Sequence, residues 1–321
     1  MSAASAPAPA EGAAPGGPPT RIELRNVSRW YGNVVAVNAV TCEIGPGITG
    51  LLGPNGAGKS TVLHLVAGLL HPSGGAVLID GIRPAGDPRV YRKIGLVPER
   101  EAVQPFLTGR EFVFMNARLQ DLAGAEHATA RAISLVDLED AQDRAIGTYS
   151  KGMRQRIKIA GALVHEPAIL LLDEPFNGMD PRQRLQMMEL LRTLAAGGAV
   201  VLISTHILEE LNDLATNVLV MVEGRLAASG HYREIRKLMT DRPHTFTVRS
   251  ADDRRLAASL LALPSVFSVE LSEAGVSIRT SDRGAFTRAL PKVARDAATT
   301  LYEVLPTDES LESVFAYLVQ R

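Results

Sequence analysis

The sequence contains a single cysteine, Cys42, among 321 residues. One cysteine excludes an intramolecular disulfide framework and a cysteine-rich metal site, and it fits a reducing compartment. A lone thiol usually serves as a small apolar side chain in the core. We therefore expect Cys42 to be a buried residue without a chemical role.

An excess of charge of one sign is also missing. The 34 lysines and arginines nearly cancel the 35 aspartates and glutamates, which leaves a formal net charge of −1. A protein without a net positive field does not gather nucleic acid or an anionic membrane surface by long-range attraction. We therefore expect no nucleic-acid partner.

Long apolar runs are absent from the sequence as well. A helix that crosses a bilayer needs about 20 apolar residues, whereas the most apolar stretches, residues 62–70 and 168–172, have core-helix and core-strand lengths. The opening segment, "MSAASAPAPAEGAAPGGPPT", is rich in Ala and Pro and lacks the basic start of a secretory signal. This composition predicts a disordered tail over residues 1–20.

The rest of the chain has enough apolar material, 46% of all residues, to bury a sizeable core. From residue 21 to about 239, short runs rich in Val, Ile and Leu alternate with helical patterns, which predicts a layered α/β domain. Buried strands are expected at residues 47–52, 94–97, 168–172, 199–204 and 218–222. Alternating patterns at 22–27 and 34–44 predict antiparallel strands, and an almost wholly helical stretch at about 108–163 predicts a helical insert.

A second, smaller domain is expected over residues 243–321, after the turn signal "DRPH". Its pattern reads strand, helix, strand, strand, helix, strand, with a last helix from Ser310. This order matches a ferredoxin-like α+β unit with one added helix. No catalytic constellation falls within it, so we interpret it as an accessory domain for regulation or docking.

The strongest chemical signal is the stretch "GPNGAGKST", which follows a predicted buried strand and opens a predicted helix. In that context the pattern predicts a phosphate-binding loop, because its glycines let successive backbone N–H groups and a helix N-terminus approach phosphate oxygens. Lys59 is expected to reach the β- and γ-phosphates, Ser60 to ligate Mg²⁺ and Thr61 to lie near the α-phosphate. The loop residues are Gly53, Pro54, Asn55, Gly56, Ala57, Gly58, Lys59, Ser60 and Thr61.

Two adjacent carboxylates, Asp173 and Glu174, end the apolar run "ILLLDEP". One of them, Asp173, is suited to the Mg²⁺ shell, and the other, Glu174, to deprotonating an attacking water. A general base of this kind contributes about 10²–10⁴-fold in rate. The plainer alternative, a solvated strand end, explains one acid better than a pair.

These motifs, in this order, resemble the nucleotide-binding subunit of an ATP-binding cassette (ABC) transporter over residues 21–239. The resemblance implies a P-loop NTPase fold that binds ATP with Mg²⁺. It implies that His206 in "STH" contacts the γ-phosphate and that Tyr31 in "RWYG" stacks on adenine; otherwise Tyr31 is an ordinary tyrosine near a strand turn. The stretch "NGMD" at residues 177–180 is similar to the family's D-loop.

The stretch "YSKGMRQR", residues 149–156, resembles the family's signature motif. The resemblance implies that Ser150 and the backbone of Gly152 contact ATP held by a second ATP-binding subunit, identical or not. A helix N-terminus favours such a terminal phosphate through its unpaired N–H donors. ATP would thus hold two subunits together, each carrying two half-sites.

The sequence departs from the family pattern at two places. The signature normally reads Leu-Ser-Gly-Gly-Gln, whereas Lys151 and Met153 stand here, so the contact expected from glutamine is missing. The Q-loop glutamine is replaced by Glu99, whose carboxylate is able to ligate Mg²⁺ but not to donate a hydrogen bond. Glu99 therefore joins Ser60 and Asp173 as an expected metal ligand.

The segment "QPFLTGREFVF" is similar to the family's stretch that docks a transmembrane permease. Phe106, Phe112 and Phe114 either line that docking groove or pack in the helical core. Lys-Gly in the signature, Pro-Glu at the Q-loop and the ending "SLESVFAYL" together resemble the export-type branch, whose permease is a separate chain. We therefore expect a peripheral motor subunit at the cytoplasmic face of the membrane. The alternatives are a soluble ABC-type ATPase of translation or DNA maintenance, and a nucleotide sensor without catalysis.

Overall fold

The computed structural model describes residues 19–100, 103–207, 209–212, 214–231, 244–272 and 275–306. The tail expected at residues 1–20, except for Pro19 and Thr20, and the helix expected from Ser310 lie outside the described residues. Among the described helices, none has the length and apolarity that crossing a membrane requires.

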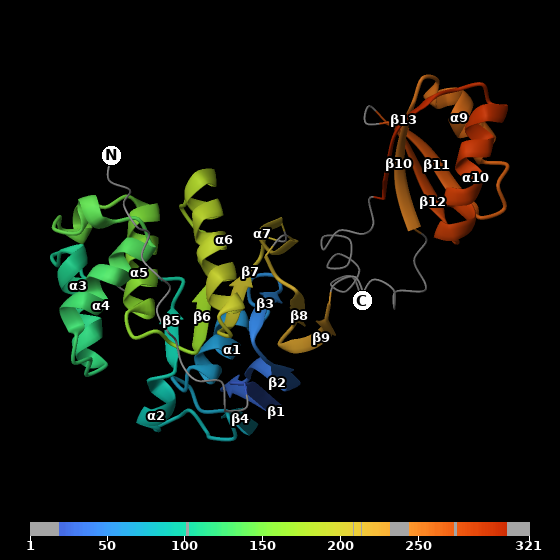
Figure 1. Cartoon of the computed structure of the whole chain (residues 1–321). Coiled ribbons are helices and arrows are strands. Elements are labelled where there is room, and N and C mark those ends of the chain that lie inside the picture. Colours follow the sequence, from blue (N-terminus) through green and yellow to red (C-terminus); the bar gives the residue numbers. More distant parts are fainter. Residues whose placement is uncertain are drawn as a thin grey trace, which may run out of the picture.

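A six-stranded sheet forms the centre of the N-terminal region, with the strand order β5-β6-β7-β3-β8-β9 (Figure 1). Strands β5, β6, β7, β3 and β8 run parallel, and β9 pairs with β8 in the antiparallel sense. The strands are β3 (Gly47–Leu52), β5 (Ile94–Val97), β6 (Ile169–Asp173), β7 (Val200–Thr205), β8 (Asn217–Val222) and β9 (Arg225–Gly230). The carboxyl ends of the parallel strands share one edge, where ligands bind in sheets of this kind.

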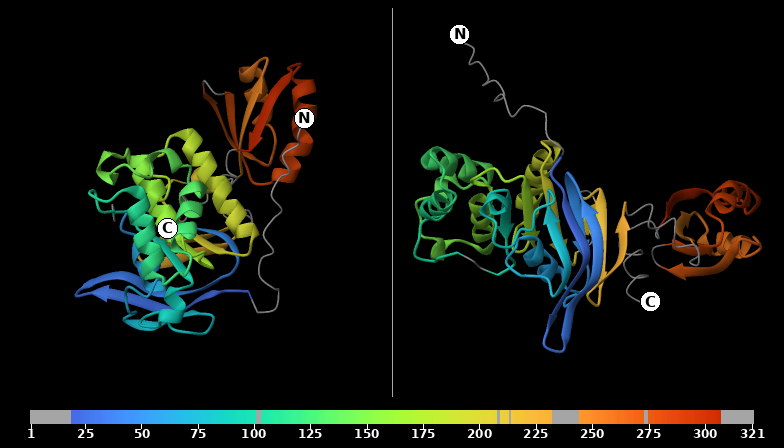
Figure 2. Two further views of the ribbon diagram at one scale, coloured as in Figure 1. Left: turned by 60° about the vertical axis from the view of Figure 1, so that its left-hand side comes forward. Right: turned by 90° about the horizontal axis from the view of Figure 1, so that it is seen from below.

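A second, antiparallel sheet has the order β2-β1-β4 and forms a separate layer, in blue and cyan in Figure 2. Its strands are β1 (Ile22–Tyr31), β2 (Val34–Ile44) and β4 (Gly74–Ile79). The backbone N–H of Asn38 in β2 donates to the carbonyl of Gly224, in the turn between β8 and β9, over 2.7 Å. Strands β1 and β2 pair in the antiparallel sense, which confirms the two expected strands, although β1 extends beyond the expected 22–27; β4 and β9 were not predicted.

Helices cover both faces of the six-stranded sheet. Most of residues 109–163 is helical, and α3, α4 and α5 gather at one end of the sheet (Figure 1). The helices here are α1 (Lys59–Val66), α2 (Pro88–Tyr91), α3 (Gly109–Leu119), α4 (Ala125–Leu135), α5 (Lys151–Leu163), α6 (Pro181–Ala196) and α7 (Glu209–Asn212), with 3₁₀ turns η1 (Glu139–Ala141) and η2 (Ile146–Thr148).

Strand β6 shows how these layers share the sheet. Leu170 and Leu172 enter a core cluster with α3 to α6, while Ile169 and Leu171 enter a second cluster with α1 and the antiparallel sheet. Because successive side chains of a strand point to opposite faces, both faces are buried and the run is continuously apolar. This explains why β6 was recognisable in the sequence.

The C-terminal region forms an antiparallel sheet of order β11-β12-β10-β13 with helices α9 and α10 on one face (Figure 1). Its elements are β10 (His244–Ser250), α9 (Asp253–Leu260), β11 (Val266–Ser272), β12 (Gly275–Thr280), α10 (Arg283–Asp296) and β13 (Leu301–Pro306). A core cluster of its own lies between the sheet and the helices, where the rings of Phe246 and Phe286 are 4.8 Å apart.

Candidate functional site

The predicted phosphate loop runs from the end of β3 to the start of α1. Gly56 and Gly58 have φ angles of 83° and 96°, which side chains other than glycine rarely adopt. A Cβ atom on Gly58 would lie 2.3 Å from the carbonyl oxygen of Ala36, so the loop packs directly against β2. Ser60 and Thr61 follow in the first turn of α1.

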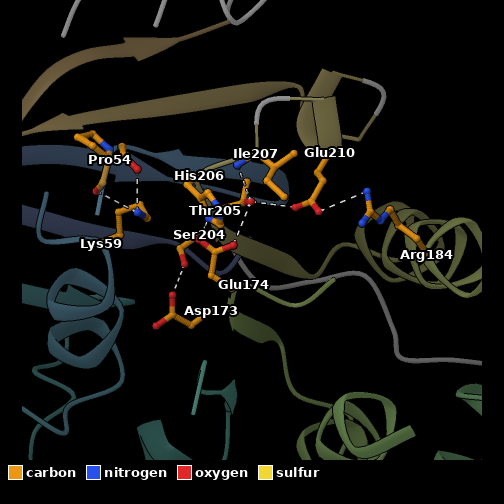
Figure 3. A network of polar contacts seen from close by, with 11 residues as sticks. Pro54, Lys59, Asp173, Glu174, Arg184, Ser204, Thr205, His206, Ile207 and Glu210 are labelled. Atoms are coloured by element: carbon orange, nitrogen blue, oxygen red, sulfur yellow. Dashed lines mark hydrogen bonds and ion pairs between the residues drawn. The ribbon is translucent and has the colours of Figure 1, made fainter. Parts of the chain in front are cut away.

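Lys59 is held inside this loop, with only 6% of its surface exposed. Its Nζ donates to the carbonyls of Gly53 and Pro54 over 2.8 and 3.2 Å (Figure 3). Two of its three ammonium hydrogens therefore shape the loop. Burial lowers the pKa of Lys59, and three carboxylates oppose that shift, those of Glu174, Asp173 and Glu99.

Asp173 and Glu174 stand at the carboxyl end of β6 beside the end of β7. The hydroxyl of Ser204 donates to the Asp173 carboxylate, which fixes its direction. Glu174 has a φ angle of 49°, and its N–H donates to the carbonyl of Ser204 over 3.0 Å. A left-handed backbone at a non-glycine residue costs about 1–3 kcal/mol and persists only where the surrounding structure holds it.

The Glu174 carboxylate has a partner on each oxygen (Figure 3). His206 Nδ1 lies 2.7 Å from Oε1, and Thr205 Oγ1 lies 3.3 Å from Oε2. Because a carboxylate only accepts hydrogen bonds, Nδ1 of His206 is the donor in this pair. The other ring nitrogen, Nε2, remains on the far side of the imidazole from Glu174.

One cavity of about 430 Å³ brings most of the predicted site residues together. Its lining comprises Val34, Val35, Ala36, Asn55, Gly56, Gly58, Lys59, Ser60, Thr61, Glu99, Asp173, Glu174 and His206. Gly53, Pro54 and Ala57 do not line it; the first two hold Lys59, and Ala57 is buried in the core.

The oxygen ligands expected for Mg²⁺ all face this cavity. Ser60, Asp173 and Glu99 supply one hydroxyl and two carboxylates. Mg²⁺ prefers oxygen and usually combines one or two carboxylates with substrate phosphates and waters. The donor set therefore fits Mg²⁺ bound together with a nucleotide. Clusters of three His, Cys, Asp or Glu side chains suited to a metal do not occur in the described part of the chain.

Tyr31 lies at the end of β1 and does not line the cavity. Its ring is 45% exposed, and the guanidinium of Arg29 sits over it at 4.6 Å from the centroid. Its partner across the strand pair is Val34, which does line the cavity. Tyr31 is thus the strand partner of a cavity residue, and the guanidinium of Arg29 lies over its ring.

Ser150 and Gly152 also lie outside this cavity. Ser150 caps α5, and its hydroxyl accepts from the N–H of Met153 over 3.2 Å. A Cβ atom on Gly152 would lie 2.8 Å from the carbonyl oxygen of Gly178, so the signature segment packs against the D-loop of its own chain. Asp180 then caps α6 with a reciprocal bond to Gln183.

The three phenylalanines of the expected docking segment have different surroundings. Phe112 is buried in the helical core and Phe114 packs partly against it, whereas Phe106 is 75% exposed. Phe112 also borders a cavity of about 290 Å³ with Pro98, Met115 and Lys158. Core packing therefore accounts for Phe112 and Phe114, and Phe112 also lines the 290 Å³ cavity.

Three polar residues around Glu174 were missed in the sequence. Thr205 ends β7, Glu210 lies in α7, and Arg184 lies in α6. Thr205 Oγ1 is 2.8 Å from Glu210 Oε2, and Arg184 approaches Glu210 Oε1 at 3.6 Å (Figure 3). The only sequence feature that pointed to this group was an acidic residue, Glu210, four positions after His206.

Known proteins share this fold and a substantial part of this sequence. The family model described as ABC transporter matches residues 37–177. The daunorubicin/doxorubicin resistance ATP-binding protein DrrA of Streptomyces peucetius is 35% identical, over 86% of this chain and 86% of that protein. The Nod factor export ATP-binding protein I of Burkholderia orbicola is 38% identical, over 65% of this chain and 70% of that protein.

Solved structures agree with these relatives. An ATP-binding subunit of an ABC transporter has a TM-score of 0.63 and 31% identity, covering 68% of this chain and 92% of that one. A dimeric ATP-binding cassette in a post-hydrolysis state, bound to ADP and phosphate, has a TM-score of 0.61 and 25% identity, covering 65% and 98%. The chain therefore belongs to the ATP-binding subunits of ABC transporters, ATPases that hydrolyse ATP for transport, and among them to the export-type branch of DrrA and the Nod factor export proteins.

Proposed function

We propose that this chain is the motor subunit of an exporter, binding MgATP in the 430 Å³ cavity and driving a separately encoded permease. The observation that carries the proposal is the convergence of Lys59, Asp173, Glu174 and His206 on that cavity. The intact base and histidine favour hydrolysis over a mere nucleotide sensor. The names of the relatives, which mention drug resistance and Nod factor export, favour transport over a role in translation or DNA maintenance.

Each site residue has a distinct role in this proposal. The loop at Gly53 to Thr61 surrounds the phosphates with N–H donors, and Lys59 adds a positive charge. Ser60, Asp173 and Glu99 would hold Mg²⁺, which would neutralise charge on the phosphates. Glu174 takes a proton from the attacking water, and His206 presents Nε2 to the γ-phosphate while Nδ1 stays bonded to Glu174. Tyr31 stacks on the adenine.

Ser150 and Gly152 complete the site of a partner subunit. They lie outside the cavity of their own chain, and a related cassette forms a dimer around its hydrolysis products. The unpaired N–H donors at the start of α5 favour a terminal phosphate. Binding of ATP therefore joins two subunits, and loss of the phosphate weakens the joint.

The permease docks at the 290 Å³ groove bordered by Pro98, Phe112 and Met115, with the exposed Phe106 nearby in sequence. This groove lies next to Glu99, so docking and the nucleotide site share one segment. We propose that the chain is thereby held at the cytoplasmic face of the membrane.

We also propose a domain division: a tail over residues 1–20, the ATP-binding domain over 21–239 with its helical insert at about 108–163, and an accessory domain over 243–321. The order βαββαβ and the strand order β11-β12-β10-β13 support a ferredoxin-like type for the last domain.

Mixed dimers test the shared site, if the working dimer has two identical chains. In the first arrangement one chain carries both Lys59→Ala and Ser150→Arg and its partner is wild type. In the second, each chain carries one of the two changes. If Ser150 acts on the partner's nucleotide, the first arrangement damages both sites and abolishes ATPase activity, while the second leaves one site intact.

Both arrangements contain the same two changes, so their general effects on folding cancel. If the two sites fire only together, both dimers are inactive, and nucleotide trapping replaces turnover as the readout: one nucleotide per dimer in the second arrangement and none in the first. Hydrolysis in the first arrangement with none in the second would overturn the shared site.

A further inference from the structure

The hydroxyl of Thr205 sits between two carboxylates. Thr205 is fully buried at the end of β7. Its Oγ1 lies 2.8 Å from Oε2 of Glu210 and 3.3 Å from Oε2 of Glu174, and it accepts from the N–H of Ile207 over 3.1 Å (Figure 3). The hydroxyl therefore connects the proposed base to a second acid from another element.

The number of hydrogens available to Thr205 and the two glutamates determines which group donates in each hydrogen bond. A threonine hydroxyl donates one hydrogen and accepts two. If both glutamates were ionised, two acceptor oxygens would compete for one hydrogen. If Glu210 carries a proton, its O–H and the N–H of Ile207 fill both acceptor positions of Thr205. The threonine hydrogen is then directed to Glu174, and each donor and acceptor position of the hydroxyl has one partner.

The surroundings of Glu210 fit this neutral form. Glu210 is 4% exposed. Burial raises the pKa of the Glu210 carboxyl, and the charge of Glu174 adds to the rise. Three groups lower this pKa: the hydroxyl of Thr205 when it donates to an ionised Glu210, the guanidinium of Arg184 and the imidazole of His206. At 3.6 Å the contact with Arg184 is longer than a normal hydrogen bond.

We propose that Thr205 and Glu210 are positioning residues for Glu174. A hydrogen-bond chain runs from Glu210 through Thr205 to one oxygen of Glu174, while His206 holds the other oxygen. Arg184 faces Glu210 from α6, the helix that begins at the D-loop, so the chain also ties the base to that helix. This inference rests on the proposed role of Glu174 as the general base.

These hydrogen bonds fix the orientation of the Glu174 carboxylate. The left-handed backbone of Glu174 aims its side chain, and bonds to both oxygens remove the remaining rotation. A base acts only when its acceptor lone pair faces the water, and a misplacement of about 1 Å can cost roughly 10²-fold in rate. Loss of the Thr205 bond therefore lowers turnover without changing how ATP is bound.

Two matched pairs of variants test the chain. Thr205→Val removes the hydroxyl at nearly constant shape, and Thr205→Ser keeps it. Glu210→Ala removes the acid, and Glu210→Gln keeps an N–H donor for Thr205 and an oxygen for Arg184. We expect Thr205→Val and Glu210→Ala to lower kcat about 10-fold or more, with the KM for ATP within about 2-fold. The conservative partners should remain within about 3-fold of wild type.

A double-mutant comparison separates positioning from general damage. Glu174→Gln alone should lower turnover at least about 100-fold while ATP binding persists. If Thr205 acts through Glu174, adding Thr205→Val to Glu174→Gln gives no further loss in single-turnover assays. Near-normal turnover of Glu174→Gln would instead reject Glu174 as the base, which is a failure of the proposed function.

The inference itself is overturned if Glu174→Gln is impaired as expected but Thr205→Val matches wild type. It is equally overturned if Thr205→Val lowers the residual turnover of Glu174→Gln by the same factor as in wild type. Should Thr205→Val fail to fold by circular dichroism, the Glu210→Ala and Glu210→Gln pair is read by the same criteria.

Discussion

The thiol of Cys42 lies in β2 and packs against the core cluster beneath the antiparallel sheet. Burial raises the pKa of this thiol to about 11. Only the thiolate is strongly nucleophilic, and a free cysteine has a pKa of about 8.5. The raised pKa leaves little thiolate at neutral pH, so the thiol is a poor nucleophile; the side chain is half-buried, whereas the sequence led us to expect a buried one.

We expect the folded protein to react slowly with a thiol reagent at pH 8, where about one thiol in a thousand would be ionised. The rate should rise about tenfold per pH unit up to the pKa. The same reagent should label the chain rapidly in denaturant. Because Cys42 is the sole cysteine, the labelling has one source. Rapid labelling of the native protein at pH 8 would show that the thiol is less buried than described.

The main site residues could be named from the sequence because short motifs carry them. Lys59 begins the helix after the loop that follows β3, Asp173 ends β6 and Glu174 follows it, and the cavity does bring them together. Thr205, Glu210 and Arg184 were missed because their roles depend on contacts among three separate elements. Residue identity alone does not show which hydroxyl meets which carboxylate.

At the scale of elements, the start of α5 depends on Gly152. A Cβ atom there would meet the Gly178 carbonyl at 2.8 Å and the Gln183 side chain at 2.7 Å. The side chain is able to move aside, but the backbone carbonyl belongs to the turn that leads into α6. The absence of a side chain at position 152 therefore permits the signature segment and the D-loop to pack together.

Gly152→Ala should destabilise the protein. Overpacking costs about 1–3 kcal/mol, which exceeds the gain of about 0.5–1 kcal/mol that alanine usually brings to a helix. Urea unfolding gives the change in free energy. Gly45→Ala is the matched control, since a Cβ atom at Gly45 meets nothing within 4 Å. If both variants were as stable as wild type, the D-loop backbone would have to shift to admit the methyl group without a cost in stability.

Strands were predictable where both faces are buried. Five parallel strands have continuous apolar runs, and all five were recognised. Strand β4 begins with two glycines, and β9 is a short edge strand of small and polar residues that pairs on one side only. Glycine and polar residues have low strand propensity. Partners along the sheet, rather than local sequence, make these two segments strands.

At the scale of the whole molecule, the described residues form three core clusters. Two of them share the six-stranded sheet, and the third draws only on residues of the C-terminal region. The order of elements in that region was predicted from its patterns, but not which strands pair. Separate cores usually unfold as separate cooperative units.

Phe286→Ala should therefore lower the stability of the C-terminal region only. Phe286 is fully buried, and loss of such a ring costs about 3–5 kcal/mol. In calorimetry of the full chain we expect two transitions, of which one moves to lower temperature, and ATP affinity should be unchanged. Phe267→Ala, at a position 65% exposed, is the control and should move neither. A single transition that shifts as a whole would show that the cores are coupled.

The left-handed backbone of Glu174 has a consequence for the history of such chains. Its conformational cost of about 1–3 kcal/mol is a sizeable share of a net stability of about 5–15 kcal/mol. Asparagine and glycine adopt this conformation more readily, so the residue that best suits the backbone at position 174 is not the glutamate that we propose as the general base. Selection for turnover must hold glutamate at position 174 against this local preference. In a duplicated copy released from that selection, drift toward asparagine or glycine would produce a more durable protein that no longer works.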